Sequence, residues 1–149
     1  MIRIKSKRKS WGQNMVMLID TNIILDVLMN RQEFIRDSSM IWKFCETKQV
    51  KGYISTLTYA NMMYVMRKQL TVETVEEVYR KLNLIFEFAD FSHAVLERAM
   101  SMKWSDFEDA LQSAVAEAVH ADCIITRNIK DFAKSNIIAF TPSELLRRL

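Results

Sequence analysis

The stretch that decides the fold of this chain is Leu18-Ile19-Asp20-Thr21-Asn22-Ile23-Ile24-Leu25-Asp26. Together with the two preceding residues, its start forms a short apolar run over 16–19, which is typical of a parallel strand buried on both faces. A helix is predicted over residues 22–29, since Asp20 or Asn22 can accept hydrogen bonds from its free N–H groups. The stretch therefore predicts a buried strand that ends at an aspartate and leads directly into a helix.

The rest of the chain continues this alternation of strands and helices. Further strands are expected at residues 52–55, 84–89, 123–126 and 137–140, and further helices at 33–48, 57–69, 71–82, 92–103 and from Pro142 onward. Another helix begins at Ser105-Asp106-Phe107-Glu108, which has the form of a capping box, and apolar residues recur at helical spacing from Phe107 to Ala118. Strands that alternate with helices predict an α/β fold with a mainly parallel sheet covered on both faces.

Length and composition indicate one globular domain. The chain has 149 residues, of which 50% are hydrophobic and 26% charged, and both values are typical of a single globular domain. No apolar run reaches about 20 residues, so no membrane segment is predicted. The two cysteines, Cys45 and Cys123, lack CxxC spacing. Their pattern argues against a zinc site and fits a reducing compartment, so a cytoplasmic protein is expected.

The positive charge of the chain is concentrated at its N-terminus. The formal net charge is +3, but residues 1–14 carry five basic side chains and no acidic one. The remaining body has 16 basic and 18 acidic side chains and is therefore slightly acidic. Two interpretations stay open for residues 1–14. They are a basic tail that binds phosphates, or they are a vector-encoded leader or upstream start that precedes a true beginning at Met15 or Met17.

Polar side chains occur at four places where a parallel α/β sheet binds ligands, beyond the carboxyl ends of its strands. They are Asp20 at the end of the first strand, Asp106 and Asp109 on the first turn of the capped helix, Asn128 and Asp131 after the strand that ends at Thr126, and Asn61. Carboxylates that converge in one cleft repel one another and are tolerated when a divalent cation neutralises them. Mg²⁺ and Mn²⁺ prefer such oxygen ligands and support phosphodiester hydrolysis.

Each of these residues also has a purely structural interpretation. Asp20 can be a helix cap, Asp106 can favour the positive end of a helix dipole, and Asp131 can be a solvated loop acid. Asn61 is the only polar residue between Tyr59 and Met66. Its apolar neighbours predict that it is held in a dry wall, either as part of a site or as a satisfied core amide. Phosphate-binding glycine loops and the GxSxG motif are absent from the sequence.

Four motifs in this order closely resemble the PIN-domain family. They are residues 18–26, Ile54-Ser55-Thr56-Leu57-Thr58, Asp106-Phe107-Glu108-Asp109-Ala110-Leu111-Gln112 and Ile125-Thr126-Arg127-Asn128-Ile129-Lys130-Asp131-Phe132. The match runs from about Met15 to the C-terminus, which implies a PIN-like nuclease domain over 15–149. The resemblance implies a three-layer α/β/α sandwich and Mg²⁺- or Mn²⁺-dependent cleavage of RNA. Many bacterial members, the VapC-like toxins, pair with an antitoxin protein and form homodimers.

The resemblance also assigns roles to particular residues. Asp20 and Asp109 match invariant metal-site acids of the family, and Asp106 matches a frequent additional one. Asn61 and Asn128 stand where many members have acids, and the sequence most resembles a subgroup of toxins in which the glutamate is replaced by Asn. Asp131 would complete the acidic pocket, while Asn61 would orient a water through its amide oxygen. Thr21, Asn22, Thr126 and Asn128 would orient the substrate.

The sequence thus predicts a metal-dependent endoribonuclease, with Asp20, Asp106 and Asp109 as metal ligands. One alternative is a PIN fold that binds RNA or a protein partner without cleavage, motivated by Asn61 and Asn128. Another is a phosphohydrolase of the haloacid-dehalogenase pattern with Asp20 as nucleophile. That chemistry requires an acid two residues later, where this chain has Asn22.

Overall fold

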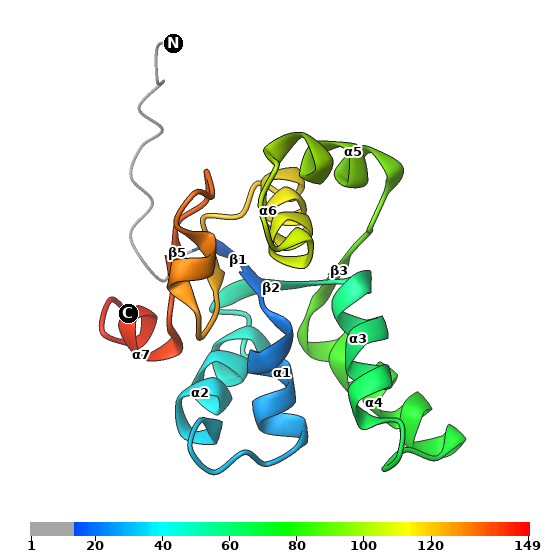
Figure 1. The fold of residues 1–149 in the computed structure, drawn as a ribbon. Coiled ribbons are helices and arrows are strands. Elements are labelled where there is room, and N and C mark those ends of the chain that lie inside the picture. The colour runs from blue at the N-terminus through cyan, green and yellow to red at the C-terminus, as the bar shows by residue number, and fades with distance from the viewer. Residues whose placement is uncertain (1–13) are drawn as a thin grey trace.

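The computed structural model describes residues 14–149, so the basic tail expected at 1–14 lies outside the described residues except for Asn14. The strands are β1 (Met15–Ile19), β2 (Val50–Ser55), β3 (Glu87–Ala89), β4 (Cys123–Ile125) and β5 (Ala139–Phe140). The helices are α1 (Thr21–Leu28), α2 (Ile35–Glu46), α3 (Thr56–Met66), α4 (Val72–Ile85), α5 (His93–Met102), α6 (Phe107–Ala118), the 3-10 helix η1 (Ile129–Phe132) and α7 (Pro142–Leu146). Figure 1 shows their arrangement. Within residues 14–149, no helix is long and apolar enough to span a membrane.

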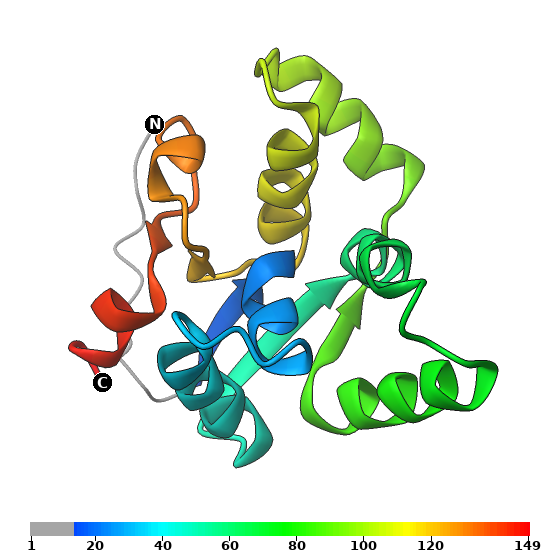
Figure 2. The same cartoon turned by 60° about the horizontal axis from the view of Figure 1, so that its bottom comes forward.

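The predicted α/β/α sandwich is confirmed. All five strands are parallel, in the order β3-β2-β1-β4-β5. Met17 and Ile19 of β1 pack in one core cluster with α1, α2, α3, α4 and α7, while Leu18 packs in the other with α5 and α6. Figures 1 and 2 show these two helical layers on opposite faces of the sheet. Alternate residues of β1 therefore face two cores, which explains why the strand is apolar throughout.

Several boundaries differ from the predictions made from sequence, most clearly at two strands. The strand expected at 84–89 is wrong over its first half, because α4 continues to Ile85 and β3 begins only at Glu87. Leu82 and Ile85 are both buried at helical spacing, whereas Leu84 is 77% exposed. The strand expected at 137–140 is likewise shorter, with β5 confined to Ala139–Phe140.

The structure also shows which residue caps α1 and which caps α6. Asp20 caps α1, which begins at Thr21. At α6 the capping residue is Asp106 rather than Ser105, because the Asp106 carboxylate accepts a hydrogen bond from the backbone N–H of Asp109. A cap at Asp106 frees the side chain of Glu108 from the role in a capping box that the sequence suggested.

The order of the strands places the first aspartate at a switch in chain direction. From β1 the chain proceeds outward to β2 and β3, then returns to the other side of β1 to form β4 and β5. The backbone N–H of Asp20 donates to the carbonyl oxygen of Ile125 at 2.9 Å, which joins the ends of β1 and β4. In open parallel sheets, the crevice at such a switch point is the usual ligand-binding position.

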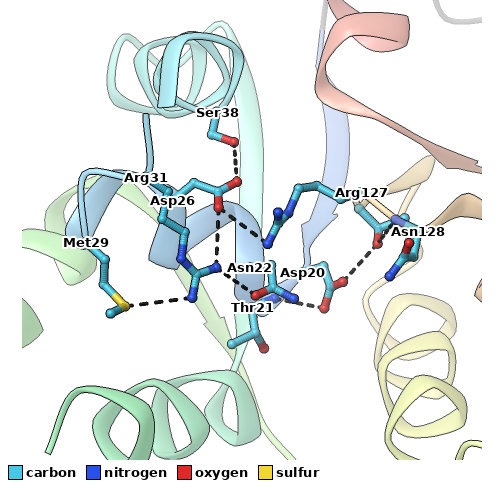
Figure 3. Close-up of polar contacts among 10 residues, drawn as sticks. Asp20, Thr21, Asn22, Asp26, Met29, Arg31, Ser38, Arg127 and Asn128 are labelled. Atoms are coloured by element: carbon cyan, nitrogen blue, oxygen red, sulfur yellow. Dashed lines mark hydrogen bonds and ion pairs between the residues drawn. The ribbon is translucent and has the colours of Figure 1, made fainter. Parts of the chain in front are cut away.

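A buried carboxylate beside this crevice connects α1, α2 and the segment after β4. Asp26 is 0% exposed, and its carboxylate accepts a hydrogen bond from Ser38 Oγ at 2.9 Å. Arg31 and Arg127 approach the same carboxylate at 3.5 Å and 3.6 Å, as Figure 3 shows. The Arg127 guanidinium also lies over the ring of Phe34, 3.8 Å from its centroid. Asp26 thus links the consecutive helices α1 and α2 to the segment after β4, which is far from them in sequence.

We expect Asp26→Asn to lower the free energy of unfolding by about 3 kcal/mol, because it leaves two partly buried guanidinium groups without a counter-charge. The matched control is Asp90→Asn, which changes an exposed acid outside the helices and strands and should alter stability by less than about 0.5 kcal/mol. Chemical denaturation of both variants provides the measurement. Equal unfolding midpoints for Asp26→Asn and the unmodified protein would contradict this role.

Candidate active site

The carboxyl ends of β1 and β4 open into a pocket of about 420 Å³. Its lining includes eight of the nine residues predicted as site residues from sequence: Asp20, Thr21, Asn22, Asn61, Asp106, Asp109, Asn128 and Asp131. They come from the end of β1, the start of α1, α3, the start of α6 and the segment after β4. The ninth residue, Thr126, does not line the pocket and is 0% exposed.

Thr126 acts on the pocket through Asp20. Its hydroxyl donates to one Asp20 carboxylate oxygen at 2.9 Å, and the backbone N–H of Thr21 donates to the other at 2.8 Å. Burial raises the pKa of Asp20, while these hydrogen bonds and the Arg127 charge lower it. Asp20 is therefore fixed in orientation at the base of the pocket, where Figure 3 places it beside Asn22.

Behind Asp20 lies an uncharged network that the sequence did not reveal. Thr58 Oγ1 accepts hydrogen bonds from Gln112 Nε2 at 2.8 Å, from Ser55 Oγ at 3.1 Å and from Thr21 Oγ1 at 3.2 Å. Gln112 is buried, and a hydrogen bond from its side chain lowers the pKa of Asp20. The signal for it in the sequence is its position three residues after Asp109, which places the two side chains on the same side of the helix.

The carboxylates of α6 lie close to the others. The pKa of Asp109 is raised to about 7, mostly by burial and then by the charges of Asp106, Asp131, Asp20 and Glu108, in that order. Asp106 is tied to this group by its hydrogen bond from the Asp109 backbone N–H at 3.1 Å. The pKa of Asp109 therefore reflects both burial and carboxylates that converge from three segments, the end of β1, the start of α6 and η1.

Glu108 belongs to the pocket, and sequence reasoning missed it. The sequence pattern predicts a capping box that includes Glu108, but its carboxylate accepts a hydrogen bond from Asn61 Nδ2 at 3.1 Å. Burial and the charges of Asp20 and Asp106 raise the pKa of Glu108. The dry wall expected around Asn61 is wrong, because Tyr64 and Val65 are 67% and 47% exposed. Asn61 is half-buried and faces the acids, so it is not a core amide.

The donor set around the pocket fits a hydrated divalent cation. Among residues 14–149, no three His, Cys, Asp or Glu side chains already form a cluster able to hold a metal ion. The carboxylates instead surround a common space, and their mutual repulsion is expressed in the raised pKa of Asp109. Mg²⁺ keeps several of its waters and binds through one or two carboxylates, so an open acidic pocket suits it better than a closed cage would.

The pKa of Asp109 predicts how the metal-free protein responds to pH. Since this pKa is about 7 in the folded state and its ordinary value is 3.8, the folded state retains a proton that the unfolded state loses. We therefore expect the Tm to fall as the pH rises from about 4 to about 7. Asp109→Asn should flatten this slope, as measured by thermal unfolding in EDTA. Identical slopes for variant and unmodified protein would contradict the prediction.

Comparison with known proteins agrees with this geometry. The PIN domain matches residues 16–130, while no curated protein sequence matches. A toxin–antitoxin complex from Klebsiella pneumoniae has a similar chain (TM-score 0.66, 26% identity, 85% of this chain and 97% of that one). VapBC2 from Rickettsia felis, bound to a promoter DNA fragment, gives a TM-score of 0.63 at 19% identity, covering 85% and 98% of the two chains. FitAcB from Neisseria gonorrhoeae gives 0.62 at 19%, with the same coverage. From its sequence match over 115 residues and its shared fold, this chain belongs to the PIN-domain family.

Proposed function

We propose that this protein is a metal-dependent endoribonuclease and the toxin of a toxin–antitoxin pair. The observation that carries the proposal is the convergence of Asp20, Asp106, Glu108, Asp109 and Asp131 on one pocket at the switch point of the sheet. Burial and the charges of these neighbours together raise the pKa of Asp109 to about 7. Crowded carboxylates in a cleft are a common feature of catalytic sites, where a purely structural role would favour separation of the charges.

The roles of the side chains follow from their positions. Asp20, Asp106 and Asp109 hold Mg²⁺ or Mn²⁺, and Asp131 adds negative charge at the pocket edge. When bound, the cation supplies the positive charge that draws a phosphodiester into an otherwise repulsive pocket and polarises it. Thr126 keeps Asp20 oriented through its 2.9 Å hydrogen bond. Thr21, Asn22 and Asn128 orient the substrate.

Asn61 and Glu108 act as a pair. The amide nitrogen of Asn61 is used by Glu108, which leaves the amide oxygen to orient a water at the pocket. Glu108 places a carboxylate of α6 next to Asn61. The side of the pocket formed by these two residues therefore carries a negative charge. Because of the amide at Asn61, we also propose that the chain belongs with the toxins in which Asn replaces the glutamate found in many members of the family.

The proposed biology follows from the family and from its structural relatives. An antitoxin protein is the expected partner, since the similar Klebsiella pneumoniae chain comes from a toxin–antitoxin complex. We further propose a homodimer that works on RNA in the cytoplasm. The second candidate function is an RNA- or protein-binding PIN domain without cleavage. It is favoured by the amides at Asn61 and Asn128, which leave fewer charges than two acids would.

Removal of two pocket acids tests the nuclease function directly. We expect Mn²⁺ to raise the Tm by mass action and to support cleavage of a panel of RNAs. Asp20→Asn combined with Asp109→Asn should abolish the Tm shift and reduce cleavage at least about 100-fold. Asp90→Asn, outside the pocket, should change neither. Metal binding without cleavage by the unmodified protein would favour the non-cleaving alternative, and an unchanged double variant would place the metal elsewhere.

A charge exchange tests the pairing of Asn61 with Glu108. Asn61→Glu places two carboxylates near each other, so we expect a lower Tm without metal and tighter Mn²⁺ binding. Asn61→Glu with Glu108→Gln exchanges the two side-chain types and should restore the metal-free Tm. Asn61→Ala should reduce cleavage with only a modest loss of stability. Calorimetric titration with Mn²⁺ and thermal unfolding are the measurements. A destabilised Asn61→Glu variant without any gain in Mn²⁺ affinity would remove Asn61 from the site.

A further inference from the structure

A second hollow adjoins the acidic pocket on the side of η1. It has a volume of about 220 Å³ and shares Asp106, Asp109 and Asp131 with the acidic pocket. Its outer part, which we call the Trp104 subsite, consists of Trp104, Ser105, Lys130 and Lys134. In Figures 1 and 2 the orange segment that contains η1 lies beside α6, and the two elements are in contact. The shared aspartates make the two hollows one continuous path.

The two lysines of the subsite differ from the other cations near the acidic pocket. Arg31 and Arg127 are paired with Asp26. Arg67 donates to the carbonyl oxygen of Tyr64 at 2.7 Å and lies over its ring. By contrast, Lys130 and Lys134 form no ion pair with any residue in the range 14–149, although acids line the same hollow. They are therefore the cations available to a ligand that enters the path.

Trp104 provides a held aromatic surface beside these lysines. It lies between α5 and α6 and is half-buried. Its ring meets Phe132 edge to face, with centroids 6.3 Å apart, and Phe132 is itself 3% exposed. The ring is thus positioned by the core while its remaining surface lines the hollow. An aromatic face combined with unpaired cations is the combination that binds single-stranded nucleic acid, through base stacking and phosphate neutralisation.

We propose that the Trp104 subsite binds the nucleotide next to the scissile phosphodiester of a single-stranded RNA. Trp104 stacks on its base, and Lys130 and Lys134 neutralise its phosphate. This inference rests on the proposed nuclease function. It specifies that the RNA strand runs from the acidic pocket into the hollow beside η1. The physical reason is charge, since a phosphate chain that meets five carboxylates is repelled unless cations lie where it leaves the pocket.

Binding of a fluorescein-labelled oligouridylate, in EDTA to prevent cleavage, tests the proposal. Trp104→Ala should weaken binding about tenfold or more, as expected for the loss of one stacked base, and Trp104→Phe should recover part of that loss. In a Trp11→Phe background, which leaves two of the three tryptophans, oligouridylate should quench tryptophan fluorescence. Adding Trp104→Phe should remove that quenching, while the buried Trp42 remains as an internal reference. Trp104→Phe retains an aromatic ring against Phe132, so it separates stacking from loss of fold.

The lysines are tested independently by salt dependence. Lys130→Gln with Lys134→Gln should lower the slope of log affinity against log salt by about 1.4, the value for two phosphate contacts on a single strand. Lys43→Gln with Lys68→Gln removes the same charge from exposed positions outside both hollows and should leave the slope nearly unchanged. The Mn²⁺-induced Tm shift should persist in every variant, since Asp20 and Asp109 are intact.

The outcomes separate this proposal from the nuclease function. Unchanged affinity, quenching and salt slope in the Trp104 and lysine variants would overturn the subsite, while cleavage by the unmodified protein would still support the nuclease. If the unmodified protein neither binds nor cleaves RNA, both are overturned. Loss of affinity in the lysine variants without any effect of Trp104→Ala would indicate that the phosphates are bound without base stacking and would also overturn the proposal.

Discussion

Mutual repulsion among carboxylates at one edge of the sheet is the constraint around which this structure is organised. Asp20, Asp131 and the three acids at the start of α6, Asp106, Glu108 and Asp109, come from three segments and line one pocket. The proximity of these charges contributes to the pKa of about 7 at Asp109. Such an arrangement costs stability in the absence of a counter-ion, so the surrounding fold has to hold the acids in place by other means.

Uncharged side chains support Asp20, while the nearby arginines bind a different carboxylate. Next to Asp20 the supporting groups are uncharged, with Thr126 bonded to its carboxylate and Thr58 and Gln112 behind it. The arginines nearby are drawn instead to Asp26, outside the pocket lining. An arginine inside the pocket would neutralise the acids permanently. Because Arg31 and Arg127 are paired with Asp26, the pocket retains the negative charge that a divalent ion would neutralise.

The same separation of charge makes the two sides of the pocket different. The arginines near α1 and α3 are paired with Asp26 or with Tyr64. Lys130 and Lys134, on the opposite side, have no ionic partner among residues 14–149. A polyanion would therefore find acids at the centre and available cations mainly on one side. The proposed Trp104 subsite follows from this asymmetry rather than from any single residue.

The sequence predicted the fold better than it predicted the details of the site. The strand at 16–19 and the capped helix after it were correct, because a buried parallel strand and a helix cap are each specified by a few adjacent residues. Glu108 was assigned to a cap, since spacing alone cannot distinguish a carboxylate that turns back to its own helix from one that reaches Asn61 of α3. The strand expected to begin at Leu84 failed for a similar reason, because apolar residues in a short run fit a helix end as well as a strand.

What the sequence alone determined is the set of local elements, their order, and the placement of acids at the ends of strands and the start of a helix. Hydrophobic periodicity and capping are local interactions, so adjacent residues carry enough information to specify them. Tertiary structure alone decided which acids face one another, that Asn61 meets Glu108, that Asp26 collects the arginines, and that Trp104 adjoins the acidic pocket. These contacts join residues up to 106 positions apart, such as Asp20 and Thr126. They depend on strand order and helix packing, which no local stretch of the sequence encodes by itself.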